Sequence, residues 1–217
     1  MLSADYVLDP DGDITIALKN PSPPFEVEPP PWYRPAPKNI EEVTFLVSSK
    51  HLFLASKYFR RALQGPWAEN CTEGMKRFEA HEWNEYAFLL VLRAIHGRMH
   101  GFRPSFNLET LVNVARVVDY YQCSEAAFVL VAGTMEDFPD PWACWSIRDR
   151  ILEIFIYFAF SMEDRFFAAT QDCVRFSNGV ISNEDMELGL PDEIVGMYRR
   201  AVQVNELLFV QDTDGGR

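Results

Sequence analysis

The sequence predicts an α+β fold, with a small β-sheet flanked by helices and an α-helical extension after it. Two short stretches, 13–18 and 43–47, alternate apolar and polar residues, which is the pattern of strands. From residue 84 onward the apolar residues recur at helical spacing instead. Strands followed by helices indicate the α+β class. The 217 residues suffice for one domain with an extension, and such a chain buries about 70% of its unfolded surface.

A proline-rich insertion separates the two predicted strands. Residues 20–40 hold eight of the fourteen prolines, which lack the N–H donor that a strand ladder requires. We expect an extended, polyproline-like connector that contributes little to stability. Trp32 and Tyr33 are the exceptions, because large aromatic side chains can pin the insertion to the surface. The spacing of Pro21 and Pro24 also resembles a ligand for aromatic grooves, and this alternative stays open.

The stretch SSKHLFLASKYFRRALQG, residues 48–65, is predicted to form a helix with one apolar face. The apolar positions are Leu52, Ala55, Phe59, Ala62 and Leu63. The opposite face carries Lys57, Arg60 and Arg61 at positions i, i+3 and i+4, in a chain that is otherwise acidic. These three residues are our candidate protein-binding residues. They form either a solvated helix face or a docking patch for an acidic protein.

A third strand is predicted at 75–81, and helices follow it. Asn84 is placed to cap the start of one predicted helix, and Gly97 is placed to end it. Asn107 likewise precedes the next predicted helix. Ser161 and Asp164 have the spacing of a capping box. The predicted helices are 84–97, 107–123, one beginning at Ser124, 146–160, 161–176 and 190–209, with a turn-rich boundary at 136–141.

The charge of the chain disfavours nucleic acid as a partner. Asp and Glu total 32 against 20 Lys and Arg, and a formal net charge of -12 repels phosphate backbones. The longest apolar run, 154–160, is far shorter than the roughly 20 residues that span a bilayer, and no secretory signal pattern begins the sequence. The four cysteines show no CxxC spacing, so we expect reduced thiols. We therefore expect an intracellular protein, cytoplasmic or nuclear, without a membrane anchor.

No motif of the sequence predicts a catalytic or cofactor site. GxSxG, a glycine-rich phosphate loop and HExxH do not occur, so an enzyme remains a minor alternative. His96 and His100 have the spacing of two metal ligands, but Gly97 falls between them at a predicted helix end. A histidine at a helix C-terminus is favoured by the helix dipole without any metal. We expect neither a metal nor a cofactor.

Two features of the C-terminal part allow a binding or a structural reading. Acidic residues gather between 184 and 193, as a docking surface for a basic partner or as a loop before a helix. Seven aromatic residues lie close together before this acidic stretch, and we expect them to be mainly core residues, with a groove for a partner as the alternative. They are Phe155, Tyr157, Phe158, Phe160, Phe166, Phe167 and Phe176.

Three segments in order resemble the BTB/POZ family. VTFLVSSKHLFLASKYFRRAL resembles its signature, in which a strand enters a helix that carries a leucine, a serine and an aromatic, here Leu52, Ser56 and Phe59. NEYAFLLVLRAIHG is similar to the family's Ala-Phe helix, with His96 in place of the usual tyrosine. LVNVARVVDYYQCSEA is similar to its next helix, and WACWSIRDRILEIFIYFAFSMEDRFFAATQDCVRF looks like the helical tail of fungal BTB-like proteins.

The resemblance implies how the chain is divided. It implies an N-terminal segment at 1–12 and a BTB/POZ-like domain at 13–136 that contains the insertion. A helical extension at 137–210 and a flexible tail at 211–217 complete the chain.

The function that the resemblance implies is protein recognition. We expect an adaptor or scaffold, in one form a substrate adaptor of a cullin-type ubiquitin ligase, and alternatively a transcriptional or chromatin co-regulator without its own DNA-binding module. Animal relatives carry a basic residue where Ser49 stands, and it helps to form a charged pocket at a homodimer interface. Because serine lacks that charge, we expect a homodimer to be weak or built differently.

Overall fold

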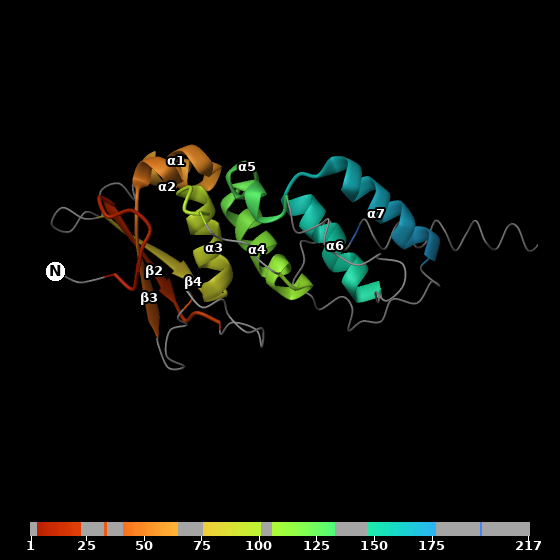
Figure 1. Ribbon diagram of the computed structural model, residues 1–217, viewed down its shortest axis with the longest axis horizontal. Coiled ribbons are helices and arrows are strands. Elements are labelled where there is room, and N and C mark those ends of the chain that lie inside the picture. Colours follow the sequence, from red (N-terminus) through yellow and green to blue (C-terminus); the bar gives the residue numbers. More distant parts are fainter. Residues whose placement is uncertain are drawn as a thin grey trace, which may run out of the picture. The chain divides into compact units, whose positions relative to one another are not determined.

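A computed structural model of the protein describes residues 4–22, 33, 41–64, 76–100, 106–132, 147–176 and 196 (Figure 1). The chain divides into two compact units, residues 1–138 and residues 139–217. The first unit contains a sheet and helices, and the described part of the second contains helices alone. The α+β class predicted from the sequence is confirmed.

The sheet of the first unit has four strands in the order β1-β3-β2-β4, and they are β1 (Tyr6–Val7), β2 (Ile14–Lys19), β3 (Glu42–Val47) and β4 (Lys76–His81). β2 pairs antiparallel with β3 and parallel with β4, while β1 pairs parallel with β3. The three predicted strands are therefore confirmed. β1 falls in the N-terminal segment, where no strand was predicted, because two residues are too few to show alternation.

Aromatic contacts join the sheet to the helices. Phe45 of β3 is fully buried, with the Tyr6 ring stacked at 5.2 Å and the Phe88 ring edge-on at 5.4 Å. Phe88 belongs to α3 (Glu85–Ile95), a helix buried on most sides, as expected from its few polar residues. Part of the core of this unit therefore lies between the sheet and α3, and buried residues of α4, which contacts α3, continue it.

The predicted helix over 48–65 is wrong in one respect, because the chain forms two helices there. α1 (Ser49–Ala55) and α2 (Lys57–Gln64) are separated by Ser56, whose backbone is extended. Leu52 and Phe59 are both buried, so the predicted apolar face is kept across the break. Helical periodicity did not show the break because the apolar spacing continues through it.

The predicted caps of α3 and of α4 (Leu108–Tyr121) are confirmed. The side chain of Asn84 accepts a hydrogen bond from the Ala87 N–H, and that of Asn107 accepts one from the Thr110 N–H. α3 ends at Ile95, and Gly97, two residues on, has the left-handed backbone that stops the helix, as predicted. The helix from Ser124 is shorter than its sequence pattern, with α5 (Ser124–Ala127) passing into the 3-10 turn η2 (Phe128–Leu130).

The second unit is described as two helices in contact, α6 (Ile147–Ala159) and α7 (Glu163–Phe176). The predicted capping box is wrong: Ser161 is left-handed and closes α6, with the N–H groups of Ser161 and Met162 bonding back to the carbonyls of Phe158 and Tyr157. The tail aromatics divide, because Phe155, Tyr157 and Phe160 are buried whereas Phe158 and Phe167 are exposed. The predicted helix at 190–209 and the acidic residues at 184–193 lie outside the described residues, apart from Gly196.

The proline-rich insertion is tied to the first unit at two described residues, Ser22, whose N–H donates to the Trp83 carbonyl at 3.1 Å, and Tyr33. The Tyr33 side chain is 4% exposed, and its ring lies 4.8 Å from that of Tyr86 on α3. At its ends, the Asn20 N–H donates to the Glu41 carbonyl at 2.9 Å. Of the two aromatics expected to pin the insertion, Tyr33 does so, and Trp32 lies outside the described residues.

Candidate functional site

The candidate residues on α2 are held by a serine that joins two helices. The Ser56 hydroxyl accepts a hydrogen bond from the Phe59 N–H and donates one to the Tyr121 carbonyl at the end of α4. It therefore caps α2, as a serine at this position is expected to do, and ties the helix to α4. The Phe59 ring stacks on the Tyr121 ring at 4.7 Å. The inner side of α2 is thus fixed by both polar and apolar contacts.

The outer side of α2 carries the three predicted cations, and the structure separates them into two kinds. Lys57 and Arg61 are exposed one turn apart, on the same face of the helix. Arg60 is also exposed, but its Nε donates to the Phe53 carbonyl at 3.2 Å and its guanidinium lies 5.2 Å from the Phe53 ring centre. Arg60 therefore braces the junction of α1 and α2, and Lys57 and Arg61 remain the candidate binding pair.

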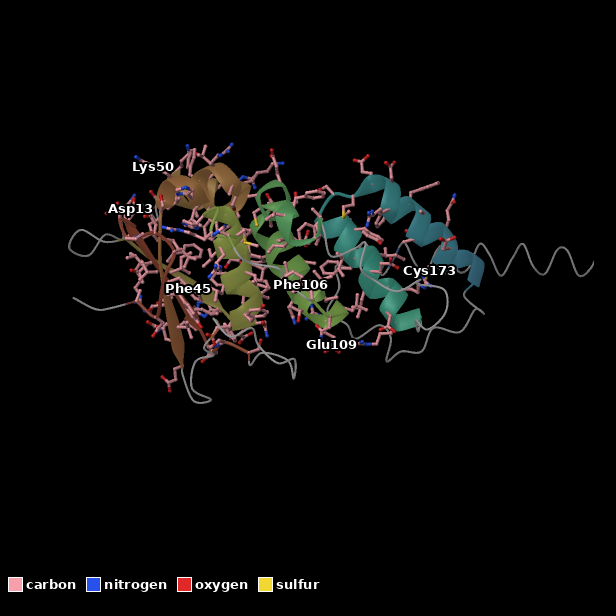
Figure 2. The ribbon with its side chains drawn as sticks, viewed as in Figure 1. Asp13, Phe45, Lys50, Phe106, Glu109 and Cys173 are labelled. Atoms are coloured by element: carbon pink, nitrogen blue, oxygen red, sulfur yellow. The ribbon has the colours of Figure 1, made fainter. Side chains whose placement is uncertain are left out.

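The sequence around this pair is depleted of negative charge. No Asp or Glu occurs between residues 43 and 68, a segment that holds Lys50 of α1 besides the three cations of α2. Figure 2 shows Lys50 at the outer side of α1. Leu54, 75% exposed, adds a large apolar side chain to the same segment. The α1–α2 segment is therefore a basic stretch of the sequence with a highly exposed leucine, on a chain of net charge -12.

The first residue of α1, Ser49, is hydrogen-bonded to a carboxylate of the same chain. Asp13 accepts two hydrogen bonds from Ser49, one from its backbone N–H and one from its hydroxyl, both at 2.7 Å. Burial alone would raise the pKa of the Asp13 carboxyl, but these bonds lower it below its usual value. Ser49, where the resemblance implies a basic residue in relatives, thus serves as an internal partner of Asp13.

A surface aromatic cluster, which the sequence did not predict as a site, lies beside the start of α2. It consists of Tyr58, Trp83 and Tyr120, and the Tyr120 ring lies 5.2 Å from each of the other two. Tyr120 is 50% exposed. A hydrogen bond with Tyr120, aided by burial, raises the pKa of Tyr58 to about 12, so the Tyr58 hydroxyl stays protonated at neutral pH.

Helical spacing distinguishes the two tyrosines that end α4. Leu111, Val114, Val118 and Tyr121 recur every three or four residues and are buried. Tyr120 lies off that row and is exposed. The pattern of α4 therefore contained the signal for an exposed tyrosine, but the neighbours of Tyr120 on α2 and before α3 come from distant parts of the sequence.

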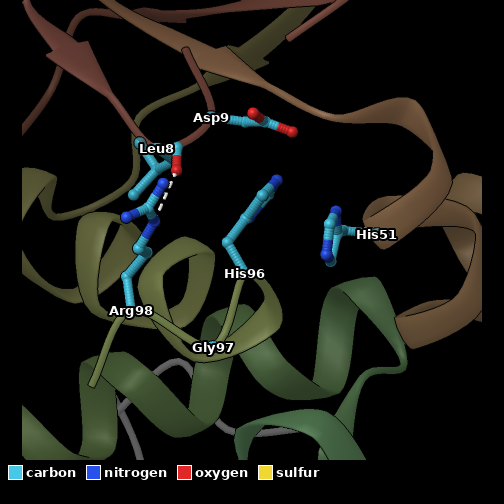
Figure 3. A pocket seen from close by; sticks show the side chains of 6 residues that line it. All are labelled: Leu8, Asp9, His51, His96, Gly97 and Arg98. Atoms are coloured by element: carbon cyan, nitrogen blue, oxygen red, sulfur yellow. Dashed lines mark hydrogen bonds between the residues drawn. The ribbon is translucent and has the colours of Figure 1, made fainter. Parts of the chain in front are cut away.

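A pocket of about 360 Å³ lies between the β1–β2 loop, α1 and the end of α3. Figure 3 shows Asp9, His51 and His96 at this pocket, with Arg98 donating to the Leu8 carbonyl. The rings of His51 and His96 are 5.0 Å apart. The His96 ring is occupied: Nε2 accepts from the Ser48 N–H at 3.1 Å, and Nδ1 donates to the Leu92 carbonyl at 2.8 Å.

The structure does not bring the two metal-ligand candidates together. Both nitrogens of His96 bond to the backbone, while His100 is exposed beyond the end of α3. Among the residues that the structure describes, no group of three histidine, cysteine, aspartate or glutamate side chains has the arrangement of a metal site.

Comparison with known proteins adds no relative. No protein-family model matches the sequence, and no curated protein is similar to it at a significant level.

Within the described parts of the chain, no helix has both the length and the apolar character needed to cross a membrane.

Proposed function

We propose that this chain is a protein-recognition module, an adaptor or scaffold, that docks an acidic partner on α1 and α2. The single observation that carries the proposal is the exposed pair Lys57 and Arg61, on a helix whose inner side is fixed by Ser56 and Phe59. A preformed surface of this kind needs little reorganisation, so less binding free energy is lost on docking.

Charge gives this surface its selectivity. A basic segment on an acidic protein attracts a complementary acidic partner and repels a basic one, which speeds encounter and fixes register more than it adds affinity. Salt at physiological strength screens charges beyond about 8 Å, so the attraction is strongest at low ionic strength. Leu54 supplies an apolar contact that salt does not screen.

The resemblance to BTB/POZ domains supports a finer form of the proposal, in which the module brings a bound protein to a cullin-type ubiquitin ligase. The contact of Ser49 with Asp13 supports a module that acts without the charged homodimer pocket of animal relatives. Light scattering tests this point, and we expect a monomer at micromolar concentration.

Affinity capture from native cells tests the function. The full chain is compared with the variant Lys57→Glu/Arg61→Glu, which leaves the brace of Arg60 intact. Arg148→Glu/Arg165→Glu is the control for net charge, because it changes the charge equally at α6 and α7. Since Arg148 lies 3.9 Å from the Asp149 carboxylate, circular dichroism first checks that this variant is folded. We expect the main captured protein to be lost with the first variant only. Cullin and ubiquitin components would support the finer proposal, whereas chromatin proteins would favour a co-regulator.

A further inference from the structure

The cations of α2 and the aromatic cluster of Tyr58, Trp83 and Tyr120 come from different segments but adjoin. The Lys57 N–H lies 3.4 Å from the Gln122 carbonyl, so the start of α2 abuts the end of α4, where Tyr120 lies. Tyr58 follows Lys57 directly, and its ring contacts that of Tyr120. The segment that carries the cations and the aromatic cluster are therefore neighbours in the fold.

The cluster is supported from within the unit. Trp83 donates through Nε1 to the Tyr121 hydroxyl at 3.2 Å, and the Tyr121 ring stacks on Phe59 in the core. Only the outer ring, Tyr120, is half-exposed, while Tyr58 and Trp83 are partly covered. A rigid ring with few rotatable bonds on a packed base is the kind of side chain that dominates protein interfaces.

We infer that α2 and the aromatic cluster form one docking surface for an acidic peptide segment that carries an aromatic residue. The inference rests on the proposed function and names the chemistry of its partner. The partner's aromatic ring packs against Tyr120, and its carboxylates face Lys57 and Arg61.

Selection from a random peptide library displayed on phage tests this chemistry with the full chain as target. We expect enriched peptides to combine Asp or Glu with a nearby Phe, Tyr or Trp. Synthetic versions should bind at least tenfold more weakly to Lys57→Glu/Arg61→Glu and severalfold more weakly to Tyr120→Ala. Tyr120→Phe should keep the binding, because it retains the ring. Phe128→Ala, which removes another exposed aromatic ring of the same unit, is the matched control.

The outcomes separate this inference from the proposed function. Enriched acidic peptides without an aromatic residue, or equal binding by Tyr120→Ala, would overturn the role of the aromatic cluster and leave the basic surface standing. Basic peptides, or no enrichment above the background of the support, would overturn both. A labelled single-stranded oligonucleotide is run in parallel, since aromatic rings beside cations also suit nucleic acid. Tighter binding of the oligonucleotide than of any peptide would overturn the inference.

Discussion

His96 at the end of α3 accepts a hydrogen bond through Nε2 from the backbone N–H of Ser48, the residue that leads into α1. A backbone N–H can only donate, so Nε2 is unprotonated and Nδ1 carries the hydrogen that bonds to the Leu92 carbonyl. The contact fixes the entry to α1 only while His96 is neutral. Protonation of Nε2 would remove the acceptor and add a charge to a buried ring.

The first prediction is a loss of stability on acidification through His96. Burial is the main cause that lowers the pKa of His96. The hydrogen bond to the Leu92 carbonyl and the charge of Asp9 oppose this shift, whereas His51 and Arg98 increase it. The unfolded chain therefore binds this proton first, near pH 6.5, and the free energy of unfolding falls as the pH drops below that value. Between pH 7.5 and pH 5.5 we expect a contribution of about 1 kcal/mol.

Urea denaturation at the two pH values measures this contribution by comparison with His96→Gln, which cannot titrate. The wild type should lose about 1 kcal/mol more than the variant over the interval. An equal loss in both proteins would show that His96 is not held neutral by the fold.

The second prediction concerns the anchor of α2. Phe59 is 2% exposed and stacks on Tyr121, so Phe59→Ala should lower the free energy of unfolding by about 3 to 5 kcal/mol through lost burial and the cavity left behind. Leu54→Ala, on the exposed side of α1, should change it by less than about 0.5 kcal/mol. Thermal unfolding of both variants provides the measurement, and an unchanged melting temperature for Phe59→Ala would refute the packing described for α2.

The third prediction separates the anchored residues of the proline-rich insertion, Ser22 and Tyr33, from the prolines between them. Replacing 21–37 by a short Gly/Ser linker removes Tyr33 together with its contact to Tyr86. We expect that replacement to cost about 3 kcal/mol, as for other buried aromatic side chains, and Tyr33→Ala alone to cost nearly as much. Shortening only 23–30 keeps Tyr33 and the bond of the Ser22 N–H to the Trp83 carbonyl, and it should leave the melting temperature within a few degrees. A large loss from the shorter deletion would contradict this division.

The sequence predicted the elements whose signals are local. The alternation of β2, the asparagine caps of α3 and α4 and the stop at Gly97 depend on neighbouring residues, and the structure has each of them. What could not be predicted depends on contacts between distant residues. Ser56 separates the two helices, and its hydroxyl bonds to the carbonyl of Tyr121, 65 residues away, a contact that no local pattern shows.

The candidate site shows the same limit. The spacing of Lys57, Arg60 and Arg61 placed all three on one helix face, but only the fold shows Phe53 under Arg60. Likewise the two tyrosines that end α4 differ in exposure by helical phase, whereas the contact of Tyr120 with Tyr58 requires α2 to lie beside α4. The spacing of the cations could thus be predicted from the sequence, whereas the contact between Tyr58 and Tyr120 could not.

The fourth prediction concerns left-handed residues at helix ends. Gly97 has a φ of 64° and open space around its Cα, so Gly97→Ala should cost about 1 to 2 kcal/mol from backbone conformation alone. Gln122 has a φ of 52° at the end of α4, and Gln122→Gly should be neutral or stabilising by up to about 1 kcal/mol. Chemical denaturation of both variants checks the signs, and a stabilised Gly97→Ala would contradict the assignment.

The central claim is that Lys57 and Arg61 bind an acidic partner, and the dissociation constant of the main captured protein tests it most directly. It is measured for the wild type and for Lys57→Glu/Arg61→Glu at low and at physiological salt, after circular dichroism has shown that both are folded. We expect the variant to bind about tenfold more weakly at low salt, since each reversed charge turns an attraction of up to about 1 kcal/mol into repulsion. The difference should narrow as salt is added. Equal dissociation constants at low salt would contradict the claim and leave Lys57 and Arg61 as a solvated helix face.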